Sequence, residues 1–382
     1  MTKPPIVSEE TRRCHLGFNH FQKIGPLKLR TLEKYFLDLR RAWSAGRSEL
    51  ERAGLKPELA KEFTEWRSSF QMTVALSELE KENIDYVTWH ETAYPRILKE
   101  ISVPPPLLYY RGRLDGIEHK RLSVVGARQH SAYAEKVITE ILPPAIGAGI
   151  EIVSGLALGV DTLAHRVAIG ASGRTIAILG SGLKADLIYP SANRHLAAEI
   201  ITTGGALISE FPPQTPPYRQ NFPQRNRIIA GLSQATLVIE AQQKSGSLIT
   251  AAYALEQNRE VLAVPGNIFS KFSDGPNRLI GAGAKIILSA EDILDIFGIP
   301  ANAPIPAGHI KDSAQSAPYR PTNKAEAIIY GLLQAATARA EKITADQIIK
   351  TSQLDTALVN STLSILEIAG IAKNTESGYD LN

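Results

Sequence analysis

The sequence predicts an α/β protein whose central domain is an extended Rossmann-like, doubly wound, mostly parallel sheet. Seven short apolar runs between residues 106 and 297 have the composition of strands that are buried on both faces. Helical stretches alternate with these runs, as they do in successive βαβ units. Helical patterns without such apolar runs flank the segment on both sides. The chain is therefore expected to contain three domains.

Residues 1–105 are predicted to form an N-terminal helical domain. The stretch LRTLEKYFLDLRRAW has apolar residues at helical spacing, and the Gly-Pro of IGPLK breaks the chain before it. This break resembles the turn of a helix-hairpin-helix or SAM-like module. A small helical bundle without any ligand has the same pattern, so both interpretations stay open.

The strands of the central domain, residues 106–297, are expected at the apolar runs. These are LSVVG, IEIVSG, TIAILG, ALISE, ATLVIEA, EVLAVP and AKIIL. The intervening stretches YAEKVITEILPPAIGA and GSLITAAYALEQN have helical patterns.

Residues 298–321 are rich in Pro, Ala and Gly and are predicted to be a linker. Residues 322–382 follow with three helical patterns and a short hairpin, which is the order of a winged-helix domain. This last segment has no excess of basic over acidic residues. Because phosphate contacts dominate the affinity of proteins for duplex DNA, we expect it to contact protein or to serve in packing instead.

The composition restricts the functional classes. A net charge of +3 is too small to attract nucleic acid through the overall field, so such binding would need a local basic site. Cys14 is the single cysteine, which excludes a disulfide framework, and no Cys/His group has zinc-site spacing. No signal peptide or membrane-spanning run is recognisable. The expectation is a cytoplasmic protein without membrane contact.

Several strands are followed by Gly-rich or basic loops. Loops at the carboxyl ends of parallel strands converge on one edge of the sheet. Glycine lets backbone N–H groups approach an anion, serine adds a hydroxyl donor, and Arg or Lys adds charge. Several adjacent phosphate-sized sites suit a polyanion better than one small phosphate. The residues expected from these loops are Gly126, Arg128, Ser154, Gly155, Lys244, Ser245, Gly246 and Ser247.

The stretch NFPQRNRIIAGLS adds Phe222, Arg225, Asn226 and Arg227 where a helix is expected to begin. Arginine is unfavourable near a helix N-terminus unless something negative offsets it, so these residues indicate a bound anion. The ring of Phe222 has two interpretations. It either packs in the core or stacks on a base of single-stranded nucleic acid.

Two other motifs are interpreted as structural. GSGLKA matches the dinucleotide pattern G-x-G-x-x-A, but no acidic residue follows at the usual separation, so a tight turn is favoured. Asp161 and His165 are i, i+4 neighbours and are interpreted as a hydrogen-bonded structural pair. Neither a nucleophile elbow nor a Walker loop is present. We therefore expect no catalytic residues, no metal site and no cofactor.

The central motifs also carry a resemblance to a known family. VVGARQHSAY, IVSGLALGVDTLAH, TIAILGSGL, YPSANR, GALISEFP, FPQRNRIIAGLS, KSGSLITAAYAL, and AVPGN followed by GPNRLIGAGA occur in the order of the DprA/Smf family of DNA-processing proteins. The resemblance implies a non-enzymatic protein that binds and protects single-stranded DNA and loads the recombinase RecA during natural transformation. It also implies a homodimer formed through the Rossmann-like domain. It places phosphate and base contacts at Arg128, Phe222, Arg225, Asn226, Arg227, Lys244 and Ser247.

Two residues depart from the family pattern. Leu158 stands where Arg is usual, and Ala134 stands where Gly is usual. The missing charge at Leu158 predicts a lower DNA affinity or a shifted strand path.

Two enzyme classes are the alternatives. A Rossmann-type nucleoside monophosphate phosphoribohydrolase has a similar Gly-rich phosphate loop followed by a catalytic Glu, but KSGSLITA lacks that Glu. A dinucleotide-dependent oxidoreductase is supported by GSGLKA alone.

Overall fold

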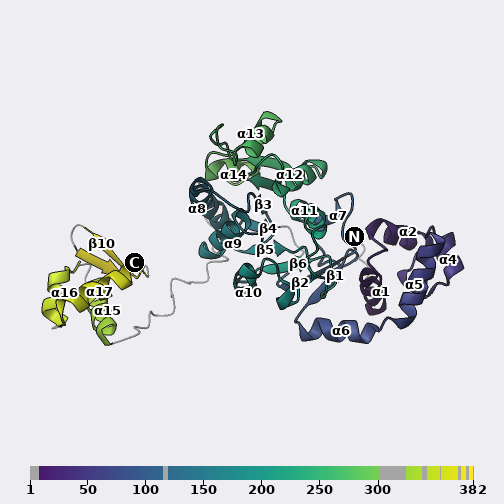
Figure 1. Ribbon diagram of the computed structural model, residues 1–382, viewed down its shortest axis with the longest axis horizontal. Helices are drawn as coiled ribbons and strands as arrows, with labels where there is room; N and C mark the ends of the chain where they lie inside the picture. The colour runs from purple at the N-terminus through teal and green to yellow at the C-terminus, as the bar shows by residue number, and fades with distance from the viewer. Residues whose placement is uncertain are drawn as a thin grey trace. The chain divides into compact units, whose positions relative to one another are not determined.

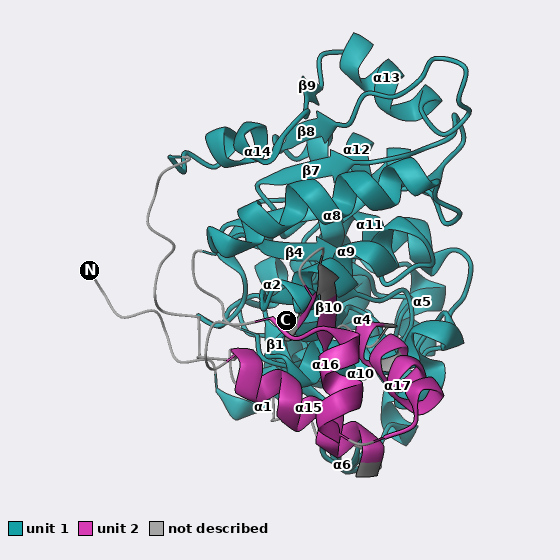
Figure 2. Cartoon of the chain, turned by 90° about the vertical axis from the view of Figure 1, so that its left-hand side faces the viewer, with its two compact units in different colours: residues 1–309 teal, residues 310–382 magenta. Residues whose placement is uncertain are grey.

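The computed structural model describes residues 8–114, 119–300, 324–337, 342–352, 354–368, 371–375 and 378–381. The chain divides into two compact units, residues 1–309 and residues 310–382 (Figure 2). From residue 301 onward, the linker predicted at 298–321 lies outside the described residues.

A nine-stranded sheet forms the centre of the first unit (Figure 1). Its strand order is β1-β2-β6-β5-β4-β3-β7-β8-β9. The seven strands from β3 to β9 pair in parallel with one another and lie at the predicted apolar runs, so the doubly wound sheet is confirmed. Their bounds are β3 Arg121–Val125, β4 Glu151–Ser154, β5 Thr175–Ile178, β6 Ala206–Ser209, β7 Ala235–Val238, β8 Glu260–Ala263 and β9 Lys285–Ile286.

Two antiparallel strands extend this sheet beyond β6. They are β1 (Asp85–Thr88) and β2 (Leu107–Gly112), which pair with each other, and β2 also pairs with β6. The expectation of helices alone up to residue 105 is therefore wrong at β1. Four residues are too few to show a strand period, and pairing with β2 rather than local pattern makes this segment a strand.

Helices cover both faces of the sheet, as the continuous apolar strands require. On one face α8, α9 and α14 pack against Leu122, Ile152 and Leu237, and on the other α7, α11 and α12 pack against Val125 and Ile178. The bounds are α7 Arg96–Lys99, α8 Ala132–Gly147, α9 Val160–Gly170, α10 Arg194–Thr202, α11 Asn221–Gly231, α12 Gly246–Glu256, α13 Asp274–Gly281 and α14 Ala290–Ile296. Within the described residues, no helix combines the length and hydropathy needed to cross a membrane.

The N-terminal residues form the predicted helices. They are α1 Glu9–His20, α2 Pro26–Phe36, α3 Leu39–Ser44, α4 Arg47–Arg52, α5 Pro57–Ser69 and α6 Met72–Lys81. Their own core contains Phe18 and Phe63, whose rings stack with centroids 5.0 Å apart. Pro26 is the first residue of α2, where its missing N–H costs nothing, so the predicted Gly-Pro break is a helix start. The likeness to a SAM or helix-hairpin-helix module stays a prediction.

The described residues of the second unit form three helices followed by an antiparallel hairpin, in the predicted order. They are α15 Lys324–Thr337, α16 Ala345–Ser352, α17 Thr356–Ile368, β10 Ala372–Thr375 and β11 Gly378–Leu381. Ile329, Leu333, Ile348, Val359 and Leu363 form its core. The winged-helix assignment stays a prediction.

Candidate functional site

A crevice lies at the carboxyl edge of the sheet, where the strand order reverses. The chain proceeds outward from β3 through β4, β5 and β6, and then returns to place β7 on the other side of β3. Such a switch point is where open α/β sheets bind ligands. Here the loops after β3, β4 and β7, together with the first turns of α11 and α12, surround a cavity of about 690 Å³.

Most of the predicted site residues line this crevice. They are Gly126, Arg128, Phe222, Arg225, Asn226, Ser245, Gly246 and Ser247. Gly155 lines a smaller adjoining hollow together with Leu158, one of the two departures from the family pattern. The other departure, Ala134, is buried in the first turn of α8.

Three predicted residues are not among the lining residues. Ser154 is buried and donates a hydrogen bond of 2.7 Å to the carbonyl of Val124, which joins two strands. Lys244 is exposed in the loop just before the α12 N-cap, Ser245. Arg227 is buried beneath the crevice, in an ion pair described below.

The crevice carries a positive charge. Arg128, Arg219 and Arg225 line it together with one acidic residue, Asp161. Arg128 and Arg219 are exposed, so both guanidinium groups are accessible to a ligand. The first turns of α11 and α12 add backbone N–H groups and the positive end of the helix dipole. This arrangement favours an extended anion.

Arg219 and Tyr189 are site residues that the sequence interpretation missed. Arg219 lies in the loop TPPYRQ between β6 and α11, and Tyr189 lies between β5 and α10. Neither segment has a strand or helix period. Arg219 could have been included from the sequence only because it lies three residues before Phe222, which was already a candidate.

Arg225 is buried, and its guanidinium is hydrogen-bonded to the ends of two strands. Its Nη1 donates to the carbonyl of Gly155 at 2.7 Å and also to the carbonyl of Ile178, at the ends of β4 and β5. Burial lowers the pKa of Arg225 to about 10, an effect that Asp161 opposes, so the guanidinium stays charged at neutral pH. The sequence interpretation assigned the negative partner of Arg225 to a bound anion. In the structure, the carbonyls of Gly155 and Ile178 and the carboxylate of Asp161 take that role.

Arg227 has a buried carboxylate as its partner. Its Nη2 lies 2.7 Å from Glu210 Oε2, and both side chains are less than a tenth exposed. Burial raises the pKa of Glu210, while the charge of Arg227 acts in the opposite direction. The geometry gives Arg227 a structural partner and leaves a DNA contact at this residue as an untested prediction.

Phe222 is half-buried at the edge of the crevice. Its ring centroid lies 5.6 Å from that of Tyr189, and the guanidinium carbon of Arg225 lies 5.9 Å from the Phe222 centroid. One side of the ring packs closely against Gly180, because a Cβ added at Gly180 would lie only 2.9 Å from Phe222 Cδ1. The ring is thus held on one side while it lines the crevice on the other.

Asp161 and His165 are structural, but the predicted hydrogen-bonded pair is wrong. Asp161 Oδ2 accepts from the backbone N–H groups of Gly155 and Ala157, which fixes the loop after β4. The imidazole Nδ1 of His165 instead lies 2.7 Å from Thr175 Oγ1. The i, i+4 spacing places both residues on one face of α9, but burial gives each a different partner.

The loop GSGLKA is a turn, as predicted. A short 3₁₀ segment, Ala185–Leu187, begins at its last residue, and α10 begins only at Arg194. A dinucleotide pyrophosphate needs a helix N-terminus directly after the glycines. This geometry argues against the oxidoreductase alternative.

Replacing Gly155 with Ala should displace Arg225. A Cβ at position 155 would clash with Arg225 Nη1, which is held by the carbonyls of Gly155 and Ile178. We expect Gly155→Ala to lower the free energy of unfolding by ~1–3 kcal/mol, the usual cost of overpacking. Urea denaturation followed by circular dichroism measures this. Gly147→Ala on α8, where a Cβ meets nothing within 4 Å, is the matched control. Equal stabilities of the two variants would contradict the packing argument.

The fold and the crevice define a doubly wound α/β protein with a positively charged edge at its switch point. The model of the DNA recombination-mediator protein A family matches residues 85–298. Protein Smf of Synechocystis sp. is 40% identical over 288 residues, which cover 74% of this chain and 72% of that protein. The chain therefore belongs to this family of DNA-processing recombination mediators, also called DprA/Smf.

Solved structures of family members are similar to this chain. The X-ray structure of DprA from Streptococcus pneumoniae is 32% identical, with a TM-score of 0.62, and covers 76% of this chain and 98% of that one. DprA from Helicobacter pylori is 26% identical, with a TM-score of 0.50, and covers 56% of this chain and 95% of that one. That structure is described as showing a single-stranded DNA binding mode.

Proposed function

We propose that this chain is a non-enzymatic recombination mediator that binds single-stranded DNA in the crevice. The observation that carries the proposal is the pair of exposed arginines, Arg128 and Arg219, that line the crevice together with the rings of Tyr189 and Phe222. Cations placed along a groove bind a phosphate backbone, and aromatic rings bind unpaired bases without sequence preference. The Helicobacter pylori relative, described by its single-stranded DNA binding mode, supports the same assignment.

The wider role in this proposal follows the family resemblance. The protein would act in the cytoplasm as a homodimer formed through the Rossmann-like domain, protect incoming single strands and load RecA onto them. Co-sedimentation with RecA on single-stranded DNA coated by a single-strand-binding protein tests the loading step. RecA filaments that form no faster with this protein than without it would contradict that step.

The direct test compares single-stranded and duplex DNA of the same sequence by fluorescence anisotropy at several salt concentrations. We expect the single strand to bind more tightly, with a logarithmic salt slope of about −0.7 for each phosphate contact. Equal affinities for the two forms would contradict the proposal.

The phosphoribohydrolase alternative has less support from the crevice. Asp161 is the acidic residue that lines it, and Asp161 Oδ2 is already bonded to two backbone N–H groups. Incubation with nucleoside monophosphates should therefore release no free base. Base release that Arg128→Ala abolishes would favour the enzyme instead.

The variant Phe222→Ala tests whether the crevice binds the bases of the DNA as well as its phosphates. Loss of a stacked ring should weaken single-strand binding by ~1–3 kcal/mol. The salt slope should not change, because an uncharged ring releases no counterions. Tyr218→Ala is the matched control, since Tyr218 is an exposed aromatic residue in the loop before α11 and does not line the crevice. If Phe222→Ala lowers the melting temperature but leaves the affinity unchanged, the ring is part of the core only.

A further inference from the structure

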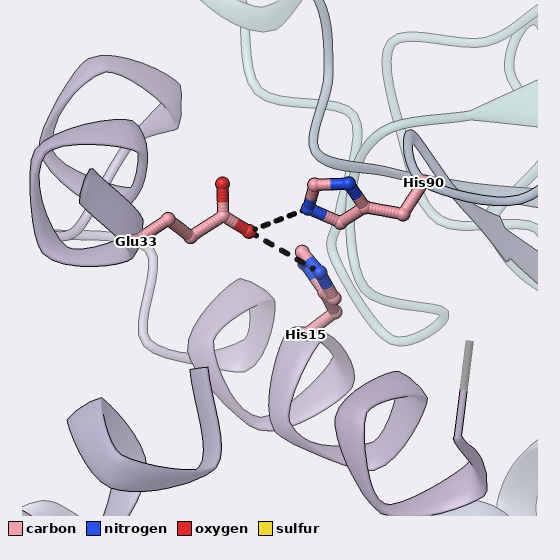
Figure 3. Close-up of side chains that lie close together, drawn as sticks. All are labelled: His15, Glu33 and His90. Atoms are coloured by element: carbon pink, nitrogen blue, oxygen red, sulfur yellow. Dashed lines mark hydrogen bonds and ion pairs between the residues drawn. The ribbon is translucent and has the colours of Figure 1, made fainter. Parts of the chain in front are cut away.

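Two histidines and a glutamate from separate segments meet where the N-terminal helices approach the sheet (Figure 3). His15 lies on α1, Glu33 lies on α2, and His90 lies in the turn after β1. The Nε2 atoms of His15 and His90 lie 3.4 and 3.0 Å from the same oxygen, Glu33 Oε1. One potential ligand atom from each residue lies within 4.8 Å of the others. The three side chains thus point toward a common position.

His15 lacks hydrogen-bond partners in its buried position. Its side chain is 0% exposed, and neither ring nitrogen has a hydrogen-bond partner among the described residues. The 3.4 Å approach to Glu33 is therefore a contact without hydrogen-bond geometry. A buried imidazole aimed at a carboxylate without a bond indicates a missing partner.

The neighbouring indole does not supply that partner. Trp89 Nε1 lies 2.9 Å from His90 Nε2 and 3.3 Å from Glu33 Oε1. If the indole donates to His90, two acceptors face each other across 3.0 Å. A cation bound to His90 Nε2 would use the lone pair of that nitrogen, and the indole would then donate to Glu33 Oε1 instead. If it donates to Glu33 and His90 does the same, His15 still has no partner.

We propose that His15, Glu33 and His90 bind a zinc ion, with water as the fourth ligand. Two imidazole nitrogens and one carboxylate oxygen are a donor set that zinc accepts, with bonds of about 2.0–2.2 Å in tetrahedral geometry. The corners of such a tetrahedron are about 3.3–3.6 Å apart, close to the 3.0 and 3.4 Å observed. Magnesium and calcium are disfavoured because they prefer oxygen ligands alone.

The ion would connect α1, α2 and the turn after β1. His90 lies 57 positions after Glu33, so the unfolded chain does not present the three ligands together. Binding to the folded state alone raises its stability. None of the three residues lines the crevice. Zinc binding and single-strand binding are therefore separate properties, and one can fail without the other.

The test uses the full chain, freed of metal by a chelator and then titrated with zinc chloride by isothermal calorimetry. We expect one ion per chain and a higher melting temperature with zinc. His90→Gln and Glu33→Gln should each weaken binding by ~10-fold or more and remove the thermal shift. His90 is exposed, so its replacement should not unfold the protein. His195→Gln, at an exposed histidine of α10, is the matched control and should behave as wild type.

Cobalt(II) provides a second readout, because four-coordinate cobalt absorbs strongly in the visible range. The wild-type protein should show this band, and His90→Gln should lack it. Two outcomes would overturn the proposal. One is a wild-type chain that binds no zinc, and the other is zinc affinity that is the same in wild type, His90→Gln and Glu33→Gln.

Discussion

Reversing both exposed arginines of the crevice, Arg128→Glu with Arg219→Glu, should weaken single-stranded DNA binding by ~100-fold or more. Each change removes an attraction to phosphate and adds a repulsion. Both side chains are exposed, so the fold should survive. Fluorescence anisotropy with a labelled oligonucleotide measures the affinity, and thermal unfolding confirms that the double variant is folded.

The salt dependence separates direct contact from a general field effect. Arg128→Ala and Arg219→Ala should each flatten the logarithmic salt slope by about 0.7, the value for one phosphate contact on a single strand. The matched control is Lys61→Glu with Lys136→Glu, which changes the net charge equally at two exposed lysines on α5 and α8. If the control loses as much affinity as the crevice variant, the crevice is not the DNA site.

Arg227→Ala should destabilise the fold strongly, by about 3–5 kcal/mol of unfolding free energy, because it leaves Glu210 buried without its partner. The two groups are 2.7 Å apart, and both are buried. Urea denaturation at pH 7 measures the loss. The double variant Arg227→Leu with Glu210→Leu removes both charges and should lose less than Arg227→Ala alone, since no unpaired charge remains.

The loss should also depend on pH. Burial already raises the pKa of Glu210, and removal of Arg227 takes away the charge that opposes this rise. A carboxyl with a raised folded-state pKa destabilises the protein as the pH rises through that pKa. The penalty of Arg227→Ala should therefore shrink toward pH 4–5, near the unfolded pKa of Glu at about 4.3. A penalty that is the same at pH 5 and pH 8 would show that Glu210 is not the source.

Much of the fold could be predicted from the sequence because buried parallel strands have a local signature. All seven runs, from LSVVG to AKIIL, are strands, and their order places the Gly-rich loops at one edge. The edge strand β1 could not be predicted, because its pairing with β2 depends on residues about twenty positions away.

The site was predictable in its loops but not in the role of each side chain. Residue type marks Arg225 and Arg227 as cations, but nothing local shows that Arg225 lies against Gly155 and Ile178, or that Arg227 meets Glu210. Gly155, Ile178 and Glu210 lie at the ends of β4, β5 and β6, which are distant in the sequence from the arginines of α11. Conversely, Arg219 lies in an irregular loop, and only the folded chain shows that it lines the crevice.

The reversal of strand order at β3 also has a consequence for the folding kinetics. Strand β3 pairs with β4 across a short separation, Leu122 with Ile152, but with β7 across a long one, Leu122 with Ala235. Pairing that closes a longer loop loses more chain entropy before any contact compensates, so it forms more slowly. We expect β3 to β6 to assemble first and β7 to β9 to dock afterwards. The crevice is lined by the loops after β3 and β7, so it is complete only when β7 has paired with β3. A refolding chain should therefore recover its strand content before it recovers affinity for a ligand.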